Sequence, residues 1–204
     1  SKILATTATS NQFYLINLDK SNGSDTLWVD CNTFSAPDGF LILTKGIFRF
    51  GGTNTFSNSF FIPYSAGNIA LQYGTGFILD NPNAVVLGQS LSGIFYLRGL
   101  LQINNGTFNI GTDANSNALV YDNDNNNPPI NSKNPGSLKL NGGILNIASA
   151  LRPSNDNDSL RYSQTNGTLN IGNFAISEIT TTGAFHLTAG STFNMSNGLI
   201  EIQR

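Results

Sequence analysis

The residues of this chain that could hold a metal ion are carboxylates in two Asn-rich segments. YDNDNNNPP contains Asp122 and Asp124, and RPSNDND contains Asp156 and Asp158. Carboxylate and amide oxygens are the ligands that Ca²⁺ prefers in proteins. The segments lack the Gly and Glu of the helical calcium loop and the Gly-Gly-x-Gly-x-Asp nonapeptide. A calcium site at these four aspartates is therefore one hypothesis, and solvated loops without metal are the other.

Residues for nucleophilic or acid–base catalysis are few. Cys31 and His186 are the only cysteine and histidine, so no internal disulfide can form and no His/Cys cluster points to zinc. A Gly-x-Ser-x-Gly nucleophile elbow is absent. Cleavage of a polysaccharide by two carboxylates, or by a lyase that uses Ca²⁺, needs acids clustered on one exposed strand face. Most acids here fall between repeats, so we expect no enzyme activity, with a polysaccharide lyase or hydrolase as the alternative.

A repeated pattern must position these residues. In GLLQINNGTFNIG, residues 99–111, apolar residues follow Gly99 by two, four, nine and eleven places, and a second Gly follows it by seven. The same frame starts at five further places, the last with one inserted residue: Gly39, Gly67, Gly136, Leu160 and Gly183. Alternation at period two predicts strands that bury one face. The Gly at the seventh place predicts a tight turn between two such strands.

Repeats of this length, made only of short strands and turns, predict an all-β chain. We expect a right-handed parallel β-helix (β-solenoid) with about six coils over residues 39–204. An antiparallel sandwich is the alternative architecture, but its strands need not share one frame. Residues 1–38 do not fit the frame and are expected to form an N-terminal cap or the end of a preceding domain. The final GLIEIQR alternates again, which predicts a stackable edge there.

One outward position of the frame is rich in asparagine. Ten places after each start stand Arg49, Phe77, Asn109, Asn146 and Asn170, with Asn194 equivalent after the insertion. Stacked coils would align the four asparagines into an exposed column. The column is either a regular polar face that binds a sugar or another chain, or a stack of amides that stabilises the rod by hydrogen bonding to one another.

Composition excludes several classes of partner. Charged residues make up 11% of the chain and the net charge is −2, so there is no basic footprint for nucleic acid. No apolar stretch approaches the roughly 20 residues needed to cross a bilayer. We therefore expect no nucleic-acid partner and no membrane span.

Two stretches carry a resemblance to known proteins. GSLKLNGGILNIASALRP and NGTLNIGNFAI resemble the degenerate Gly-x-Leu-x-Leu coils of large secreted bacterial surface proteins, such as autotransporter passengers and the giant adhesins of Bacteroidetes. The likeness covers residues 39–204 and rests on a structural repeat. It implies export, a secreted or cell-surface location, and a role as stalk or adhesin, and it transfers no catalytic residue.

The sequence thus predicts a structural and adhesive section of a bacterial cell-surface or secreted protein. Its expected partners are a surface glycan, a protein or further copies of itself. No cofactor is expected, with Ca²⁺ at the four aspartates as the alternative. A subunit of an extracellular filament or of a phage fibre is a further alternative. These alternatives differ in what the exposed faces of the coils must contain.

Overall fold

The protein is described by a computed structural model that covers residues 2–5, 12–62, 67–89, 93–111, 117–123, 134–172 and 184–203. Its regular secondary structure there is entirely β, in seventeen strands. Every pairing between these strands is parallel. The described residues contain no helix that is long and apolar enough to cross a membrane.

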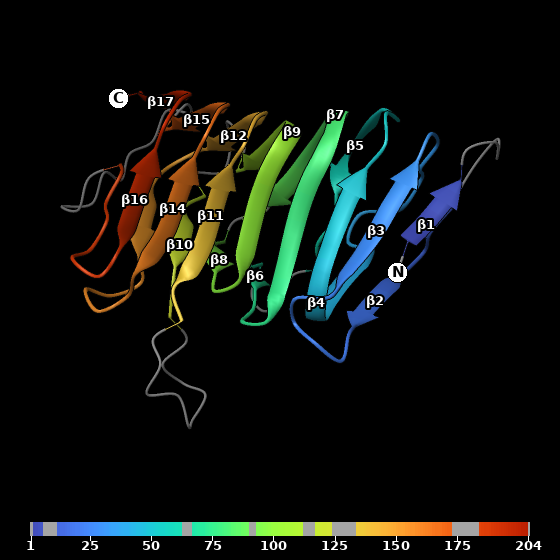
Figure 1. The fold of residues 1–204 in the computed structure, drawn as a ribbon, viewed down its shortest axis with the longest axis horizontal. Coiled ribbons are helices and arrows are strands. Elements are labelled where there is room, and N and C mark those ends of the chain that lie inside the picture. Colours follow the sequence, from blue (N-terminus) through green and yellow to red (C-terminus); the bar gives the residue numbers. More distant parts are fainter. Residues whose placement is uncertain are drawn as a thin grey trace.

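The main path of the larger, thirteen-stranded sheet forms the face seen in Figure 1. This path runs in sequence order through eight strands: β1(Lys2–Ala5), β3(Thr26–Cys31), β4(Leu41–Gly51), β7(Thr75–Gln89), β9(Leu100–Ile110), β11(Gly136–Leu140), β14(Leu160–Gln164) and β16(Thr192–Met195). Each strand of this path pairs with the following strand of the path, so the path grows by stacking one coil on the previous one.

The remaining strands lie behind this face or beside it (Figure 1). Five of them join the large sheet off its main path: β2(Ile16–Asp19), β5(Phe56–Ser59), β12(Ile144–Ile147), β15(Thr168–Ile171) and β17(Leu199–Ile202). The last four form a separate parallel sheet: β6(Ile69–Leu71), β8(Phe95–Leu97), β10(Leu119–Tyr121) and β13(Leu151–Pro153). Rows of parallel strands around one core are the arrangement expected of a β-solenoid.

Long strands turn a corner between the two rows of the large sheet. The first half of β9 pairs with β11, and its second half pairs with β12. Gly106 stands at this corner with φ of 80°, and an added Cβ would lie 2.3 Å from the carbonyl oxygen of Asn81 in the coil below. Only glycine fits both the dihedral angle and the close approach. The predicted turn at the seventh place of the frame is therefore present here.

The register confirms the frame in the second half of the chain. Leu101, Leu138 and Tyr162 stand opposite one another in β9, β11 and β14. One strand further along each coil, Phe108, Leu145 and Leu169 do the same in β9, β12 and β15. The starts at Gly99, Gly136 and Leu160 are therefore equivalent positions of successive coils.

The frame is wrong for the copies that start at Gly39 and Gly67. Phe48 pairs with Phe77, and Phe77 pairs with Leu101, so both phenylalanines belong to the first strand of a coil rather than to the second. Phe77 was expected to face outward and is fully buried. Both strands of a coil carry the same apolar alternation beside a glycine, which allows a frame read from sequence to slip by one whole strand.

The last copy slips in the same way. Phe193 pairs with Tyr162, so it also belongs to a first strand, while Gly183 lies outside the described residues. Phe185, expected in the same row as Tyr162, instead bridges to Leu151 beside the smaller sheet. Residues 1–38, expected to form a cap or a preceding domain, contribute β1, β2 and β3 to the large sheet.

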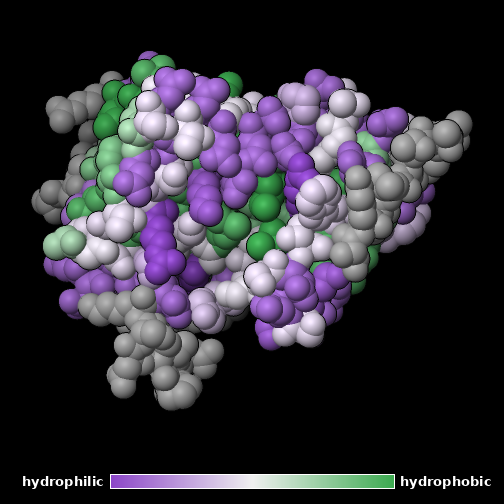
Figure 2. Space-filling model, viewed as in Figure 1, coloured by the Kyte–Doolittle hydropathy of each residue, from purple (hydrophilic) through white to green (hydrophobic). Residues whose placement is uncertain are grey.

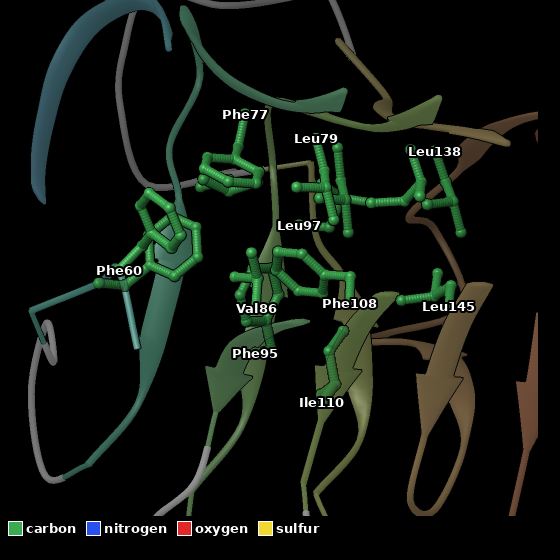
Figure 3. Close-up of a cluster of buried hydrophobic side chains, with 14 of the residues drawn as sticks. Phe60, Phe77, Leu79, Val86, Phe95, Leu97, Phe108, Ile110, Leu138 and Leu145 are labelled. Carbon is green, nitrogen blue, oxygen red and sulfur yellow. The ribbon is translucent and has the colours of Figure 1, made fainter. Parts of the chain in front are cut away.

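The core between the sheets changes character along the molecule (Figure 3). Its N-terminal part, here called the aromatic core, contains ten buried rings in mutual contact: Phe34, Phe40, Phe48, Phe50, Phe56, Phe60, Phe61, Phe77, Phe95 and Phe108. The part beyond it, here called the aliphatic core, contains Leu138, Leu140, Leu145, Ile147, Leu169 and Ile171, all fully buried. Burial of this apolar surface is the main stabilising contribution to the fold.

Candidate functional site

Three of the four predicted asparagines form a hydrogen-bonded column on β9, β12 and β15. Asn146 stands opposite Asn109 on one side and opposite Asn170 on the other. The Nδ2 of Asn146 donates to the Oδ1 of Asn109 at 2.7 Å, and the Nδ2 of Asn170 donates to the Oδ1 of Asn146 at 2.8 Å. These amides are half-buried and spend part of their hydrogen-bonding capacity on one another. The contact supports the stabilising role that the sequence left open.

The prediction that Asn194 is the fourth member of this column is wrong. Asn194 lies in β16 opposite Ser163, whereas the place next to Asn170 belongs to Glu201 of β17. The Oδ1 of Asn170 is buried and accepts no hydrogen bond within the described part of the chain. An ionised carboxylate has no proton to donate, so Glu201 cannot continue the column.

A second amide column was missed by the sequence analysis. Asn104, Asn141 and Thr165 stack at the end of the first strand of successive coils. The Nδ2 of Asn141 donates to the Oδ1 of Asn104 at 3.0 Å, and the Oγ1 of Thr165 donates to the Oδ1 of Asn141 at 3.2 Å. Each residue stands five places after its frame start, so the signal was present in the repeat.

Of the four aspartates predicted to bind calcium, Asp122 is engaged in an ion pair. Its Oδ2 accepts from Nε and Nη2 of Arg98 at 3.0 and 2.8 Å. Arg98 also donates from Nη1 to Oε1 of Gln72 at 3.0 Å. Both charged side chains are mostly buried, so this pair holds β8 and β10 together at the edge of the smaller sheet.

Asp158 is buried and organises the turn before β14. Its Oδ1 accepts from the backbone N–H of Asn123 at 3.1 Å, and its Oδ2 accepts from the N–H of Asn155 at 2.9 Å. Backbone donors of this kind satisfy a buried carboxylate. The Oγ1 of Thr188 donates to the carbonyl oxygen of Asp158 itself. This aspartate therefore ties two loops and the following segment together.

The other two aspartates add no third ligand to either position. Asp156 is exposed in the turn, and Asp124 lies outside the described residues. Nowhere in the described ranges do three His, Cys, Asp or Glu side chains gather closely enough to hold a metal ion. The calcium site stays a prediction, and two of its four proposed carboxylates already have protein partners.

The cysteine and the histidine both make contacts within the fold. Cys31 is fully buried as part of the apolar core. His186 follows the bridge between Leu151 and Phe185, and its carbonyl oxygen accepts from the hydroxyl of Tyr121 at 3.0 Å. Its Nδ1 is buried without a hydrogen-bond partner among the described atoms. These contacts are those of structural residues.

The outward face of the large sheet carries charge in two separate places. Toward the N-terminus, the guanidinium carbon of Arg49 lies 4.0 Å from the ring centroid of Trp28, and Arg49 forms an ion pair with Asp80. Toward the C-terminus, Lys139 of β11 and Arg161 of β14 are exposed. Figure 2 shows this face as a mosaic of hydrophilic patches around an apolar hollow near its centre.

A further hollow lies at the C-terminal end of this face. It has a volume of about 460 Å³ and is lined by Ser163, Thr165, Phe193, Asn194, Met195 and Ser196. Ser163 and Asn194 are register partners, so the hollow follows the β14–β16 pair. Hydroxyl and amide groups next to an apolar surface are typical of a site that binds a polar organic ligand.

Comparison with known proteins gives no relative from which a function could be transferred. The chain matches no protein family, no curated protein and no solved structure. The fold and the arrangement of its side chains therefore carry the functional argument.

Proposed function

We propose that this chain is a structural and adhesive section of a bacterial cell-surface or secreted protein, and that it acts as a rigid stalk or adhesin. In this proposal the strands wind as a right-handed parallel β-helix with about six coils. The observation that supports it most is the stacking of β1 to β16 in sequence order over one continuous apolar core. A solenoid of this kind transmits load through backbone hydrogen bonds between neighbouring coils.

The side-chain chemistry supports a scaffold over an enzyme. Asp122 and Asp158 are engaged in structural contacts, and the polar columns are made of amides and a hydroxyl. Amides donate and accept hydrogen bonds, but they do not ionise near neutral pH, and acid–base catalysis requires a group that does. The described outward faces therefore carry groups that suit binding to another molecule better than acid–base catalysis.

Labelling of intact source cells with an antibody against this chain tests the location. Label at the cell surface or in the culture fluid is expected, and label found only after permeabilisation would contradict the proposal. Activity is tested separately by incubating the chain with acidic and neutral polysaccharides, with and without Ca²⁺. We expect no new reducing ends and no unsaturated products, and turnover of any polymer would establish the enzyme alternative instead.

A further inference from the structure

Two cationic side chains lie close together on the outward face of β11 and β14. Lys139 stands opposite Ser163 in the parallel register, and Arg161 precedes Ser163 by two residues, so all three side chains lie on one face. Lys139 and Arg161 are exposed. The ion pairs found in the described residues belong to Arg49 and Arg98, which leaves these two cations without a carboxylate partner there.

The 460 Å³ hollow adjoins this pair of charges. Ser163 lines the hollow and is also the register partner of Lys139, which places Lys139 beside the hollow, and Arg161 precedes Ser163 by two residues on the same strand face. The ring of Phe193 is 47% exposed there and stacks on Tyr162 with ring centroids 5.1 Å apart. Phe193 lies in the inward row of Tyr162, so the outward part of the site combines positive charge with the hydroxyl and amide groups of Ser163, Thr165 and Asn194.

No described acidic side chain of this face neutralises the two cations. Asp80 is held by Arg49 and Asn105 in the N-terminal half of the face. Glu201 belongs to β17, which pairs with β15 in the other row of strands. Asp158 points its carboxylate at two backbone amides below β14. The C-terminal part of the face thus presents local positive charge on a chain whose net charge is −2.

We propose that Lys139, Arg161 and the adjoining hollow bind an acidic polysaccharide, a chain of sugars that bear carboxylates. The ammonium and guanidinium groups would donate charge-assisted hydrogen bonds to sugar carboxylates. Ser163, Thr165 and Asn194 would form hydrogen bonds with the sugar hydroxyls. This inference rests on the proposed adhesive function and names the class of ligand for it.

Charge complementarity and shape favour this ligand over other polyanions. Two cations are too few to neutralise the dense phosphates of a nucleic acid. Stable attachment to an anionic membrane by electrostatics needs a larger basic cluster or an inserted apolar segment. A polysaccharide has fewer charges per unit length and many hydroxyls, which match a site made of two cations and several neutral polar groups.

The test is isothermal titration of the full chain with polygalacturonate and with its fully methyl-esterified form, in which each carboxylate is replaced by a neutral ester. We expect binding of the acidic form, weaker binding of the ester, and loss of affinity at high salt. The double variant Lys139→Gln/Arg161→Gln should bind the acidic form about tenfold more weakly, because each exposed charge contact contributes modestly. Arg152→Gln removes one cation from β13 in the smaller sheet and is the matched control, which should bind like the unchanged chain.

Equal binding of the acid and the ester, or unchanged affinity of the double variant, would overturn the inference. The same holds if DNA or anionic lipid vesicles bind as tightly as polygalacturonate, since the face would then be a general polyanion surface. A surface-located chain that binds no acidic glycan would overturn this inference and leave the proposed scaffold role standing. An intracellular chain would remove the proposed role itself.

Discussion

The N-terminal and C-terminal halves of this protein form the same stacked parallel sheets with different kinds of core side chain. The aromatic core contains ten phenylalanines whose rings meet at varied angles, from the near-parallel pair Phe48–Phe77 at 12° to the edge-on pair Phe95–Phe108 at 87°. The aliphatic core repeats leucine and isoleucine in fixed columns and adds amide columns at its surface. The N-terminal half packs large aromatic rings at varied angles, and the C-terminal half repeats the same aliphatic and amide side chains from coil to coil.

The two halves also differ in the regularity of some of their strand pairings. Pairing between β7 and β9 shifts register at three points, whereas pairing of β12 with β9 and with β15 is continuous. Rings pack in the aromatic core where the register is continuous as well, since Phe48 and Phe77 are register partners in β4 and β7 with nearly parallel rings. In β9, β12 and β15, identical polar residues meet at hydrogen-bonding distance. The C-terminal half can thus be stabilised by columns as well as by packing, and the N-terminal half depends more on packing volume.

The largest effect should come from removing a ring at the centre of the aromatic core. Phe60 is fully buried and contacts seven other rings, so Phe60→Ala should lower the free energy of unfolding by about 4 kcal/mol. Leu145→Ala in the aliphatic core removes less volume and should cost about 3 kcal/mol. Equilibrium unfolding in urea measures both. A smaller loss for Phe60→Ala than for Leu145→Ala would contradict the greater dependence of the N-terminal half on packing volume.

A second effect concerns Tyr162, which occupies a leucine position of the regular half. Burial raises the pKa of its phenol, and its hydroxyl donates to Oε1 of Gln164 at 2.6 Å. The fold favours the neutral phenol, so this contribution is fully present below about pH 10 and is lost as the pH rises further. We expect the free energy of unfolding to fall above about pH 10. The loss should exceed the contribution of one hydrogen bond, because ionisation of Tyr162 would place an unpaired charge in the core.

Stability measured from pH 9 to 12 tests this expectation. Tyr162→Phe should flatten the decline above about pH 10 and cost about 1 kcal/mol at neutral pH, where Gln164 loses its donor. An unchanged alkaline decline in this variant would assign the effect to other groups.

A third and smaller effect concerns the middle of the asparagine column. Asn146→Ala removes both hydrogen bonds of the column and leaves Asn109 without its donor and Asn170 without its acceptor. We expect a loss of about 1–2 kcal/mol and faster amide hydrogen exchange in β12. Asn197→Ala, at an exposed turn, is the control and should change stability little. Equal losses in the two variants would show that the column does not stabilise the coils.

The smallest expected effect is a gain in stability from a substitution at the end of the asparagine column. Glu201→Asn would supply an N–H to the unpartnered Oδ1 of Asn170 and should raise the free energy of unfolding by about 0.5–1 kcal/mol. Glu201→Ala removes the carboxylate without supplying a donor and serves as the control. If both variants gain equally, the benefit comes from losing the carboxylate and not from extending the column.

The strands and their parallel stacking were predictable because alternation and a repeated glycine are local signals. The assignment of strands to coils was predictable only in the regular half, where Leu101, Leu138 and Tyr162 keep one frame. It failed for Phe77 and Phe193 because a coil contains two strands with the same apolar spacing. Periodicity alone does not distinguish the first from the second.

The candidate sites, like the strands, could be predicted only where the coils keep one frame. Asn109, Asn146 and Asn170 were predicted together because they lie in coils that keep the frame, whereas Asn194 was displaced by one strand. Lys139 and Arg161 hold different offsets in their repeats and stand diagonally across β11 and β14, where Arg161 is opposite Ser137 and Lys139 is opposite Ser163. The structural contacts of Asp122 and Asp158 depend on loops whose course no repeat encodes.

The register between β9 and β11 is continuous although Gly99 and Gly136 are 37 residues apart, compared with 24 residues between Gly136 and Leu160. The extra residues of this coil therefore enter between strands and leave the stack on both sides undisturbed. Such a scaffold can exchange one surface segment for another during evolution while its core is conserved unchanged. The connection between β9 and β11 therefore offers protein engineers a place to insert a foreign peptide without disturbing the stacked strands.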